Sequence, residues 1–338
     1  MDPEALAEAV CAGDRRALAR AITLVESTRP DHRAAADALL ERVTPRAGDA
    51  FRLAVSGPPG AGKSTLIETL GLMLVEQGLR LAVLAVDPSS SRTGGSILGD
   101  KTRMARLARH EQVFVRPSPA GRTLGGVARN TREAIALCEA HGADVVLVET
   151  VGVGQSETAV AAMTDLFLLV ASPGGGDELQ GIKRGIMELA DAVCVNKADG
   201  ELEQAAHRAV GEYRAALRLM QPRHPGVPPL VAPVSALTGA GLASLWEGLA
   251  ERRRALADSG ALARVRAEQA QAWMWDEVRE AMLARVRRGD LGALAADLER
   301  RVAEGAVPPR TAAAHLLRAL EGAGSASAAA RPGAERPA

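Results

Sequence analysis

The sequence predicts an α/β fold built on a doubly wound, mostly parallel β-sheet, with helical extensions at its N-terminal and C-terminal ends. Short apolar runs alternate with helix-length segments through the middle of the 338-residue chain. Because each run is apolar throughout, without alternation between apolar and polar positions, it fits a strand that helices cover on both faces. The expected strands are 51–55, 81–86, 113–115, 145–148, 166–170, 192–195 and 230–234.

Helices are expected before and after this sheet region. Asp14 is placed to cap one amphipathic helix near the N-terminus, and Asp31 is placed to open a second. After about residue 256 the chain is rich in Arg, Ala and Glu, and it ends in a small-residue stretch with the composition of a disordered tail. The expected parts are an N-terminal helical extension (1–48), a sheet domain (49–255), a C-terminal helical arm (256–322) and a disordered tail (323–338).

Charge and hydropathy narrow the classes of function. The 41 basic and 41 acidic residues balance to a net charge of zero, which argues against binding to nucleic acid or a membrane surface through bulk charge. The chain has no run of about eighteen apolar residues, and its N-terminal segment carries acid where a signal peptide carries base. We therefore expect a soluble, cytoplasmic protein with no nucleic-acid and no membrane partner. The three cysteines are far apart, so they indicate neither a disulfide framework nor a zinc site.

Lysine and asparagine are scarce in this chain. Only four of the 41 basic residues are lysines, and asparagine occurs twice. Since arginine serves as the general cation here, the lysines become candidates for sites that need a compact ammonium group. Lys63 and Lys197 fall inside the motifs described next, whereas Lys101 and Lys183 lie in glycine-rich loops.

The strongest motif follows the first expected strand. The pattern G-x-x-x-x-G-K-[ST] occurs between a strand and a helix, which is the setting of a phosphate-binding loop. Its glycines let backbone N–H groups turn toward phosphate oxygens, Lys63 reaches the β- and γ-phosphates, and the Ser64 hydroxyl coordinates Mg²⁺. The sequence therefore predicts a P-loop nucleoside triphosphatase with Lys63 as a catalytic residue. The predicted loop consists of Gly57, Pro58, Pro59, Gly60, Ala61, Gly62, Lys63, Ser64 and Thr65.

A second motif indicates guanine as the base. Asn196, Lys197 and Asp199 follow the strand expected at 192–195. The Asp199 carboxylate can accept hydrogen bonds from the ring N–H and the exocyclic amine of guanine, whereas adenine offers neither donor. We expect Asn196 to brace this loop and the Lys197 stem to cover the base. The last expected strand leads into a segment placed to offer a backbone N–H to the guanine carbonyl, namely Ser235, Ala236 and Leu237.

Acidic residues at strand ends predict a magnesium site and a sensor of the γ-phosphate. Glu149 follows the strand 145–148 and precedes a glycine, and such a carboxylate acts on Mg²⁺ directly or through water in P-loop enzymes. Val153 follows that glycine, so no glutamine stands where Ras-like enzymes orient water, and Gln155 is the nearby candidate for a catalytic role. The expected cofactors are Mg²⁺ and bound GTP or GDP. The predicted metal ligands are Ser64, Asp87, Asp100 and Glu149.

Six segments of the chain together resemble one family. They are GPPGAGKST, VDPSS, GGSILGDKTRM, ETVGVGQSE, PGGGDELQGIKRGIMELAD and NKAD. The chain is similar in these segments to the MeaB/MMAA-type GTPases, which are chaperones of cobalamin-dependent acyl-CoA mutases and include bacterial members labelled ArgK. The resemblance runs from residue 14 to about residue 290 and includes the segments that link the nucleotide motifs.

The resemblance implies a GTPase of low intrinsic activity that helps to load and protect the adenosylcobalamin of an acyl-CoA mutase, with methylmalonyl-CoA mutase as the expected partner. It also implies that residues 49–255 are the GTPase domain and that the helices of 256–322 form the arm of a homodimer. The family assigns GGSILGDKTR to switch I, ETVGVGQSE to switch II, and PGGGDELQGIKRG to a third switch that faces the partner. In this third switch, Lys183 is a candidate catalytic residue, because a partner that orders the loop would bring Lys183 or Arg184 toward the active centre.

Two other functions stay open at this point. A metallochaperone GTPase for another metalloenzyme would need a Cys/His site, which the isolated cysteines and the six histidines do not supply. A transport-associated kinase, which the ArgK label suggests, would need a second substrate pocket and usually ATP, whereas Asp199 favours guanine. The sequence does not decide which acyl-CoA mutase is served.

Overall fold

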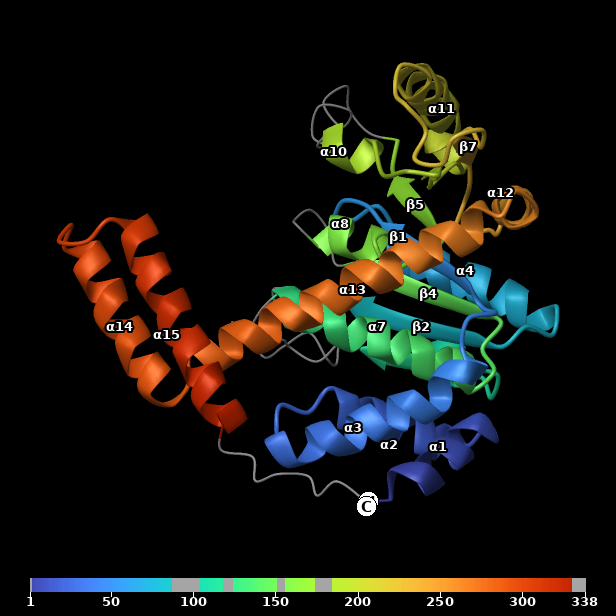
Figure 1. Cartoon of the computed structure of the whole chain (residues 1–338). Coiled ribbons are helices and arrows are strands. Elements are labelled where there is room, and N and C mark those ends of the chain that lie inside the picture. The colour runs from blue at the N-terminus through green and yellow to red at the C-terminus, as the bar shows by residue number, and fades with distance from the viewer. Residues whose placement is uncertain (1, 87–103, 118–123, 151–155, 174–183, 330–338) are drawn as a thin grey trace. The chain divides into compact units, whose positions relative to one another are not determined.

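The computed structural model describes residues 2–86, 104–117, 124–150, 156–173 and 184–329 (Figure 1). The chain forms two compact units, Met1–Ala267 and Glu268–Ala338. The predicted start of the C-terminal arm, residue 256, falls within helix α12 (Leu242–Asp258), and the second unit begins inside helix α13 (Ala261–Val286). None of the helices in the described part of the chain is long and apolar enough to cross a membrane.

A parallel sheet forms the centre of the first unit (Figure 1). Within the described residues it has seven strands in the order β3-β2-β4-β1-β5-β6-β7, and every neighbouring pair is parallel. All residues of the four central strands are buried, as the uninterrupted apolar runs predict. The predicted α/β fold is thus confirmed, with strands β1 (Phe51–Ser56), β2 (Leu81–Val86), β3 (Val113–Pro117), β4 (Val145–Thr150), β5 (Leu166–Ala171), β6 (Ala192–Val195) and β7 (Leu230–Pro233).

Helices cover both faces of the sheet. On one face, buried leucines of α4 (Lys63–Glu76) and α12 join the side chains of Leu53 and Val55 from β1 in the main hydrophobic core. Helix α7 (Leu124–Ala140) lies on the other face. The Arg52 side chain of β1 points to this face and forms a buried ion pair with Glu139 of α7. The remaining helices of this region are α6 (Ala105–Ala108), α8 (Ser156–Ala161), α10 (Arg184–Met187) and α11 (Glu203–Arg218), with a short 3-10 turn η2 (Gly200–Leu202).

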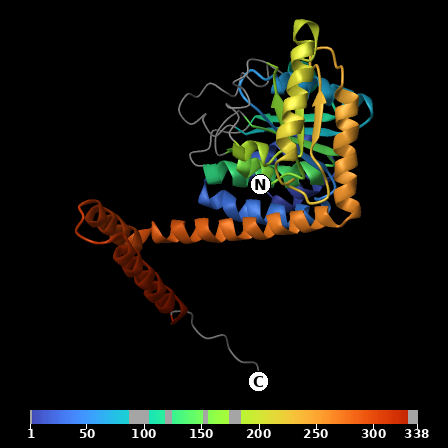
Figure 2. The ribbon, with the colours of Figure 1, turned by 90° about the horizontal axis from the view of Figure 1, so that it is seen from above.

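The N-terminal extension packs onto the sheet domain and belongs to the same compact unit. Its helices lie together beside α7 (Figure 1; Figure 2). Asp14 caps the second of them, since its carboxylate accepts hydrogen bonds from the N–H groups of Arg16 and Ala17. Asp31 lies in the first turn of the third helix, one residue after its start. The extension comprises α1 (Pro3–Cys11), α2 (Arg15–Val25), α3 (Pro30–Val43) and η1 (Thr44–Arg46).

A buried carboxylate fixes the start of α13 to the amino edge of the sheet. Asp165, which immediately precedes β5, is fully buried and accepts two hydrogen bonds from the Arg266 guanidinium, at 2.8 and 2.7 Å. The same carboxylate accepts the backbone N–H of Arg52, and Arg266 also donates to the carbonyl of Ala50 at 2.6 Å. The first turns of α13 are therefore tied to both β1 and β5.

The second unit contains a helical hairpin after α13. Its helices α14 (Gly289–Ala303) and α15 (Pro309–Ala329) enclose a small core of Leu298, Val307 and Ala312. The predicted tail begins at residue 323, but α15 continues to Ala329, because the alanines of this segment have the highest helix propensity. Residues 330–338 lie outside the described part of the chain.

Replacing Arg266 tests the role of this buried ion pair. We expect Arg266→Ala to lower the free energy of unfolding by about 3 kcal/mol, since it leaves the buried Asp165 carboxylate with fewer partners. Arg264→Ala removes an exposed arginine from the same helix and should change stability by no more than about 0.5 kcal/mol. Urea denaturation of both variants measures the difference, and equal stability would contradict the anchoring role of Arg266.

Candidate nucleotide-binding site

The predicted site residues that lie in the described part of the chain gather at the carboxyl edge of the sheet. The strands are parallel, so the segments that follow β1, β4, β6 and β7 leave the sheet at the same edge. Strand β1 lies between β4 and β5. The connection from β1 leads to β2 on one side of β1, whereas the connection from β4 leads to β5 on its other side, so the strand order reverses direction here. Such a switch point is where open α/β sheets bind ligands.

Two glycines of the loop after β1 occupy positions that no larger residue can take. Gly57 has a φ of 151°, and a Cβ there would lie 2.1 Å from the backbone oxygen of Val170 in β5. Gly62, at the start of α4, has a φ of 88°, and a Cβ there would lie 2.4 Å from Nδ2 of Asn196. The loop is therefore shaped by close backbone approach to β5 and to the segment after β6.

Lys63 is the first residue of α4 and is buried. Its Nζ donates hydrogen bonds to the backbone oxygens of Gly57 and Pro58, at 2.8 and 3.1 Å. The ammonium group is thus held inside the loop and close to the N-terminal end of α4. Both the positive charge and the helix N-terminus favour a bound anion at this point.

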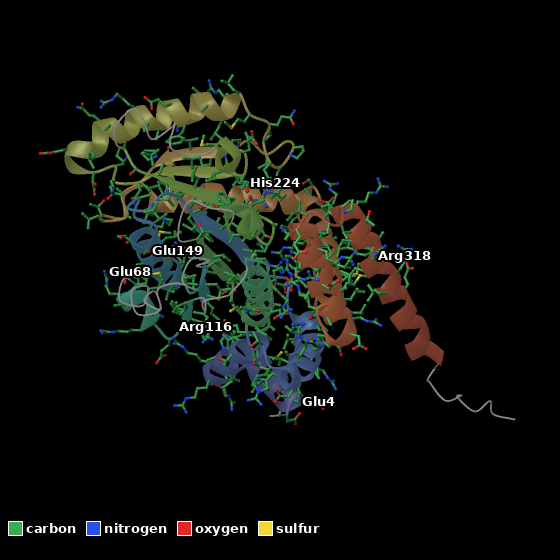
Figure 3. The ribbon with its side chains drawn as sticks, turned by 90° about the vertical axis from the view of Figure 1, so that its left-hand side faces the viewer. Glu4, Glu68, Arg116, Glu149, His224 and Arg318 are labelled. Carbon is green, nitrogen blue, oxygen red and sulfur yellow. The ribbon has the colours of Figure 1, made fainter. Side chains whose placement is uncertain are left out.

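Ser64 and Glu149 lie side by side, although 85 positions separate them in the chain. The Ser64 hydroxyl donates to Oε1 of Glu149 at 2.9 Å, and the carboxylate lies at the end of β4 (Figure 3). The next residue, Thr150, donates to the Ser56 hydroxyl at 2.8 Å and so holds the ends of β4 and β1 together. A hydroxyl and a carboxylate oxygen are ligands that suit Mg²⁺, so these two residues fit the predicted metal.

Asn196 connects the loop after β1 with the loop after β7. Its side chain is almost fully buried, its Nδ2 donates to the Ala61 oxygen at 2.8 Å, and its Oδ1 accepts the Ala236 N–H at 2.9 Å. The following residue, Lys197, has a φ of 60°, and among the described residues no other non-glycine has a positive φ. Backbone strain of this kind is held in place by surrounding contacts and often marks functional sites.

The Asp199 carboxylate is held in one orientation by the segment after β7. The Ser235 hydroxyl donates to Oδ2 of Asp199 at 2.6 Å and accepts the N–H of Thr238 at 3.1 Å. Backbone pairing of Ala198 with Val234, at 2.9 Å, brings the two segments together. The carboxylate is half-buried and acceptor-only when ionised, as a site for the donor edge of guanine requires.

The segment Ser235 to Leu237 differs in one detail from the expectation. The Ala236 N–H, predicted to serve a guanine carbonyl, donates to Asn196 here, so a guanine carbonyl would have to share this donor. Leu237 is exposed. Thr69 of α4 holds the same peptide unit from its other side, since its hydroxyl donates to the Ala236 oxygen at 2.6 Å. Sequence reasoning missed Thr69, because a threonine within a helix carries no pattern that identifies its partner.

Asp87, Asp100, Gln155 and Lys183 lie outside the described residues, so their predicted roles stay predictions. Thr65, the last residue of the predicted loop, is exposed in the first turn of α4.

A parallel sheet with a glycine-rich loop between β1 and α4 at its switch point defines the fold of the P-loop GTPases. A family profile described as "Methylmalonyl Co-A mutase-associated GTPase MeaB" matches residues 18–290, and the chain belongs to this family. The resemblance inferred from the six sequence segments is therefore confirmed.

Individual relatives agree with this family. The chain is 48% identical over 320 residues to the mitochondrial methylmalonic aciduria type A homolog of Mus musculus. The aligned region covers 91% of this chain and 77% of that protein. It is 48% identical over 271 residues to the GTPase ArgK of Escherichia coli, with 80% of this chain and 82% of that protein covered. A crystal structure of a LAO/AO transport system kinase matches with a TM-score of 0.75 and 36% sequence identity, covering 94% of this chain and 97% of that chain.

Replacing Asn196 tests the link between the two loops. We expect Asn196→Ala to lower the free energy of unfolding by about 1–3 kcal/mol, because the Ala61 oxygen and the Ala236 N–H both lose a buried partner. Asn130→Ala, at the chain's other asparagine on α7, is the matched control. Thermal and urea unfolding compare the two, and a native-like Asn196→Ala would show that the amide does not hold the loops.

Proposed function

We propose that this protein binds GTP with Mg²⁺ at the carboxyl edge of its sheet and hydrolyses it in the service of an adenosylcobalamin-dependent acyl-CoA mutase. Nucleotide binding is supported by one observation: hydrogen bonds of Asn196 join the loop that holds Lys63 to the segment that orients Asp199. The triphosphate binds at the N-terminus of α4, and the base lies between the loops after β6 and β7.

Preference for guanine rests on Asp199. Its carboxylate accepts the two donors of the guanine edge, and Ser235 keeps it from rotating away. Adenine brings no donor to this position, so an ATP complex would leave a partly buried carboxylate without its partners. Lys197 lies exposed beside Asp199, and its stem covers the base.

Hydrolysis depends on stabilising the charge of the transferring phosphoryl group. Lys63 and the first N–H groups of α4 stabilise the negative charge on its oxygens. Ser64 and Glu149 would hold Mg²⁺, which neutralises phosphate charge when bound. Gln155 is the candidate for orienting water, and unassisted hydrolysis is slow because Val153 occupies the position next to the sensor glycine.

The partner we propose is methylmalonyl-CoA mutase, and the role is assistance with cofactor loading and protection. The support is the family description, which names a mutase-associated GTPase, and the relative named after methylmalonic aciduria. We place this activity in the cytoplasm. The transport-kinase title of one solved relative is the second candidate, but phosphoryl transfer to a small substrate gives no reason for a guanine-specific carboxylate such as Asp199.

Replacing one carboxylate oxygen of Asp199 by an amide NH₂ group should change the base preference. We expect Asp199→Asn to weaken GTP binding by about 100-fold and to improve binding of xanthosine triphosphate, because the amide donates to the xanthine carbonyl. The variant keeps an oxygen for the Ser235 hydroxyl, so the loop should hold its shape. Asp258→Asn, at an exposed position of α12, is the control, and calorimetry with both nucleotides measures the switch. Unchanged GTP affinity in Asp199→Asn would contradict the assignment.

The mutase partnership can be tested by hydrolysis rates. We expect purified methylmalonyl-CoA mutase to accelerate GTP hydrolysis by the native protein and to bind its GTP and GDP forms with different affinity. Lys183→Ala combined with Arg184→Ala should keep the intrinsic rate and lose most of the stimulation. If the mutase neither binds the protein nor stimulates its hydrolysis, the proposed partnership is wrong. If the mutase stimulates the double variant fully, Lys183 and Arg184 take no part in the mechanism.

We further propose that the protein is a homodimer held by its C-terminal arm. Helix α13 carries large apolar side chains that are exposed, namely Met274, Trp275, Val278, Met282 and Leu283. Two of the chain's three tryptophans lie on this one helix, in a protein with only 2% aromatic residues. A partner copy that covers this set would remove the cost of its exposure to water.

Charged substitutions on α13 test the dimer without removing part of the chain. We expect Trp275→Glu combined with Met282→Glu to give a monomer, because dimerisation would then bury two unpaired carboxylates in the proposed interface. Leu219→Glu, at the exposed C-cap of α11, should leave the assembly unchanged. Light scattering measures the mass, and a dimeric double variant would show that α13 does not form the interface.

A further inference from the structure

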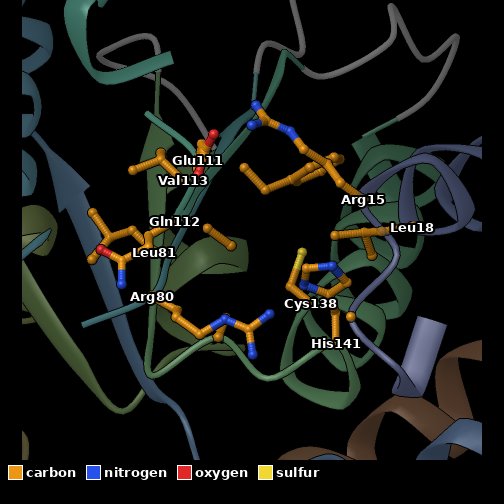
Figure 4. Close-up of a pocket in the computed structure, with 13 residues that line it drawn as sticks. Arg15, Leu18, Arg80, Leu81, Glu111, Gln112, Val113, Cys138 and His141 are labelled. Carbon is orange, nitrogen blue, oxygen red and sulfur yellow. The ribbon is translucent and has the colours of Figure 1, made fainter. Parts of the chain in front are cut away.

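A polar cavity lies at the amino edge of the sheet, away from the carboxyl edge that carries the proposed nucleotide loop. Its volume is about 80 Å³, and its walls come from the start of α2, the starts of β2 and β3, and the end of α7 (Figure 4). Three of the side chains that line it are cationic or can become so, namely Arg15, Arg80 and His141.

Arg80 points its guanidinium toward the His141 ring (Figure 4). Two glycine backbones confine it, because a Cβ at Gly142 would lie 2.6 Å from Nη1 and a Cβ at Gly13 would lie 3.4 Å from Nη2. The main chain of Arg80 is also fixed, since its N–H donates to the Asp144 carboxylate at 2.8 Å. Within the described residues, no hydrogen bond or ion pair uses the guanidinium itself. A confined cation with unused donors is prepared for an acceptor from outside the chain.

His141 adds a buried ring nitrogen that has no protein partner among the described residues. Its Nε2 is buried and makes no hydrogen bond among the described residues, although the ring also has a backbone hydrogen bond with Gly13. Burial lowers the pKa of His141, and the charge of Arg80 lowers it further. A buried ring nitrogen of this kind costs stability unless a ligand or water satisfies it.

Arg15 lies at the mouth of the same cavity. Its guanidinium makes two long hydrogen bonds, to the backbone oxygens of His110 at 3.3 Å and Ala108 at 3.4 Å. These bonds orient the group, and an ionised acceptor would give it shorter and stronger ones. Glu111 also lines the cavity, at an exposed position, and supplies one opposing charge.

We propose that this cavity, which we call the Arg80 pocket, binds a small tetrahedral oxyanion, either free phosphate or the terminal phosphate group of a larger ester. Guanidinium groups pair with phosphate oxygens through parallel N–H donors, and a group of this size fits the volume. An apolar ligand would leave the Arg80 donors and His141 Nε2 unsatisfied, so it does not suit these walls. The site is independent of the nucleotide function, because it uses none of the residues at the carboxyl edge.

Binding to the Arg80 pocket should take up a proton. The charged or titratable groups facing His141 are Arg80 before β2, Arg15 and Asp14 at the start of α2, and Glu111 before β3, with Cys138 on α7 beside it. With its pKa lowered, the free ring is neutral near pH 7, and a bound anion favours the imidazolium and raises that pKa. Affinity should therefore rise as the pH falls through the pKa of the bound state, and sulfate, which does not titrate there, is the probe for this effect.

The experiment is an NMR titration of the His141 ring in the full-length protein. The ring signals are assigned by their loss in His141→Gln, and inorganic phosphate is added to native, Arg80→Gln and Arg16→Gln proteins. Arg16 is the matched control, since it is an exposed arginine on α2 that does not line the cavity. We expect a saturable shift of the His141 signals, weakened about tenfold or more in Arg80→Gln and unchanged in Arg16→Gln.

Two further arms separate the sources of the signal. Lys63→Ala should leave the His141 titration unchanged, which distinguishes the Arg80 pocket from phosphate bound at the nucleotide loop. Phenyl phosphate binding more tightly than inorganic phosphate would identify an ester as the preferred ligand, and equal or weaker binding would identify the free ion. No shift of His141 with phosphate or sulfate, or an equal shift in Arg80→Gln, would overturn the proposal.

Discussion

One buried amide holds together the two loops of the proposed nucleotide site. Asn196 donates to the loop after β1 and accepts from the loop after β7, so the proposed phosphate end and the proposed base end share one fixed spacing. Gly62 passes so close to this amide that a Cβ would overlap it, and Thr69 of α4 holds the other side of the Ala236 peptide. A ligand that spans from Lys63 to Asp199 therefore meets a site whose length is already set, which reduces the entropy lost on binding.

The opposite edge of the sheet is fixed by buried charged side chains. Asp165 accepts hydrogen bonds from the Arg266 guanidinium and from the Arg52 backbone N–H, and Glu139 pairs with the Arg52 side chain at 2.7 Å. These pairs connect β1, β5, α7 and the start of α13 at the amino ends of the strands, opposite the proposed nucleotide loops. Buried ion pairs of this kind specify one arrangement of the elements, because a displaced partner leaves an unpaired charge in the interior.

The strands and the phosphate loop could be predicted because their signals are local. Uninterrupted apolar runs locate the strands, and the glycine-lysine spacing locates the loop within nine residues. The contacts that fix the site could not be predicted, because they join residues far apart in the chain. Ser64 meets Glu149 across 85 positions, and Asn196 meets Ala61 across 135, so only the folded sheet brings them together. The Arg80 pocket was missed for the same reason, since Arg80 and His141 follow no shared pattern.

We propose that Asp199 makes this site specific for guanine. The most direct test of this proposal is isothermal calorimetry of the native protein with GTP and ATP, both with Mg²⁺ and at the same salt concentration. We expect ATP to bind at least about 100-fold more weakly, since adenine leaves the Asp199 carboxylate without its two donors. Equal affinity for the two nucleotides would contradict it.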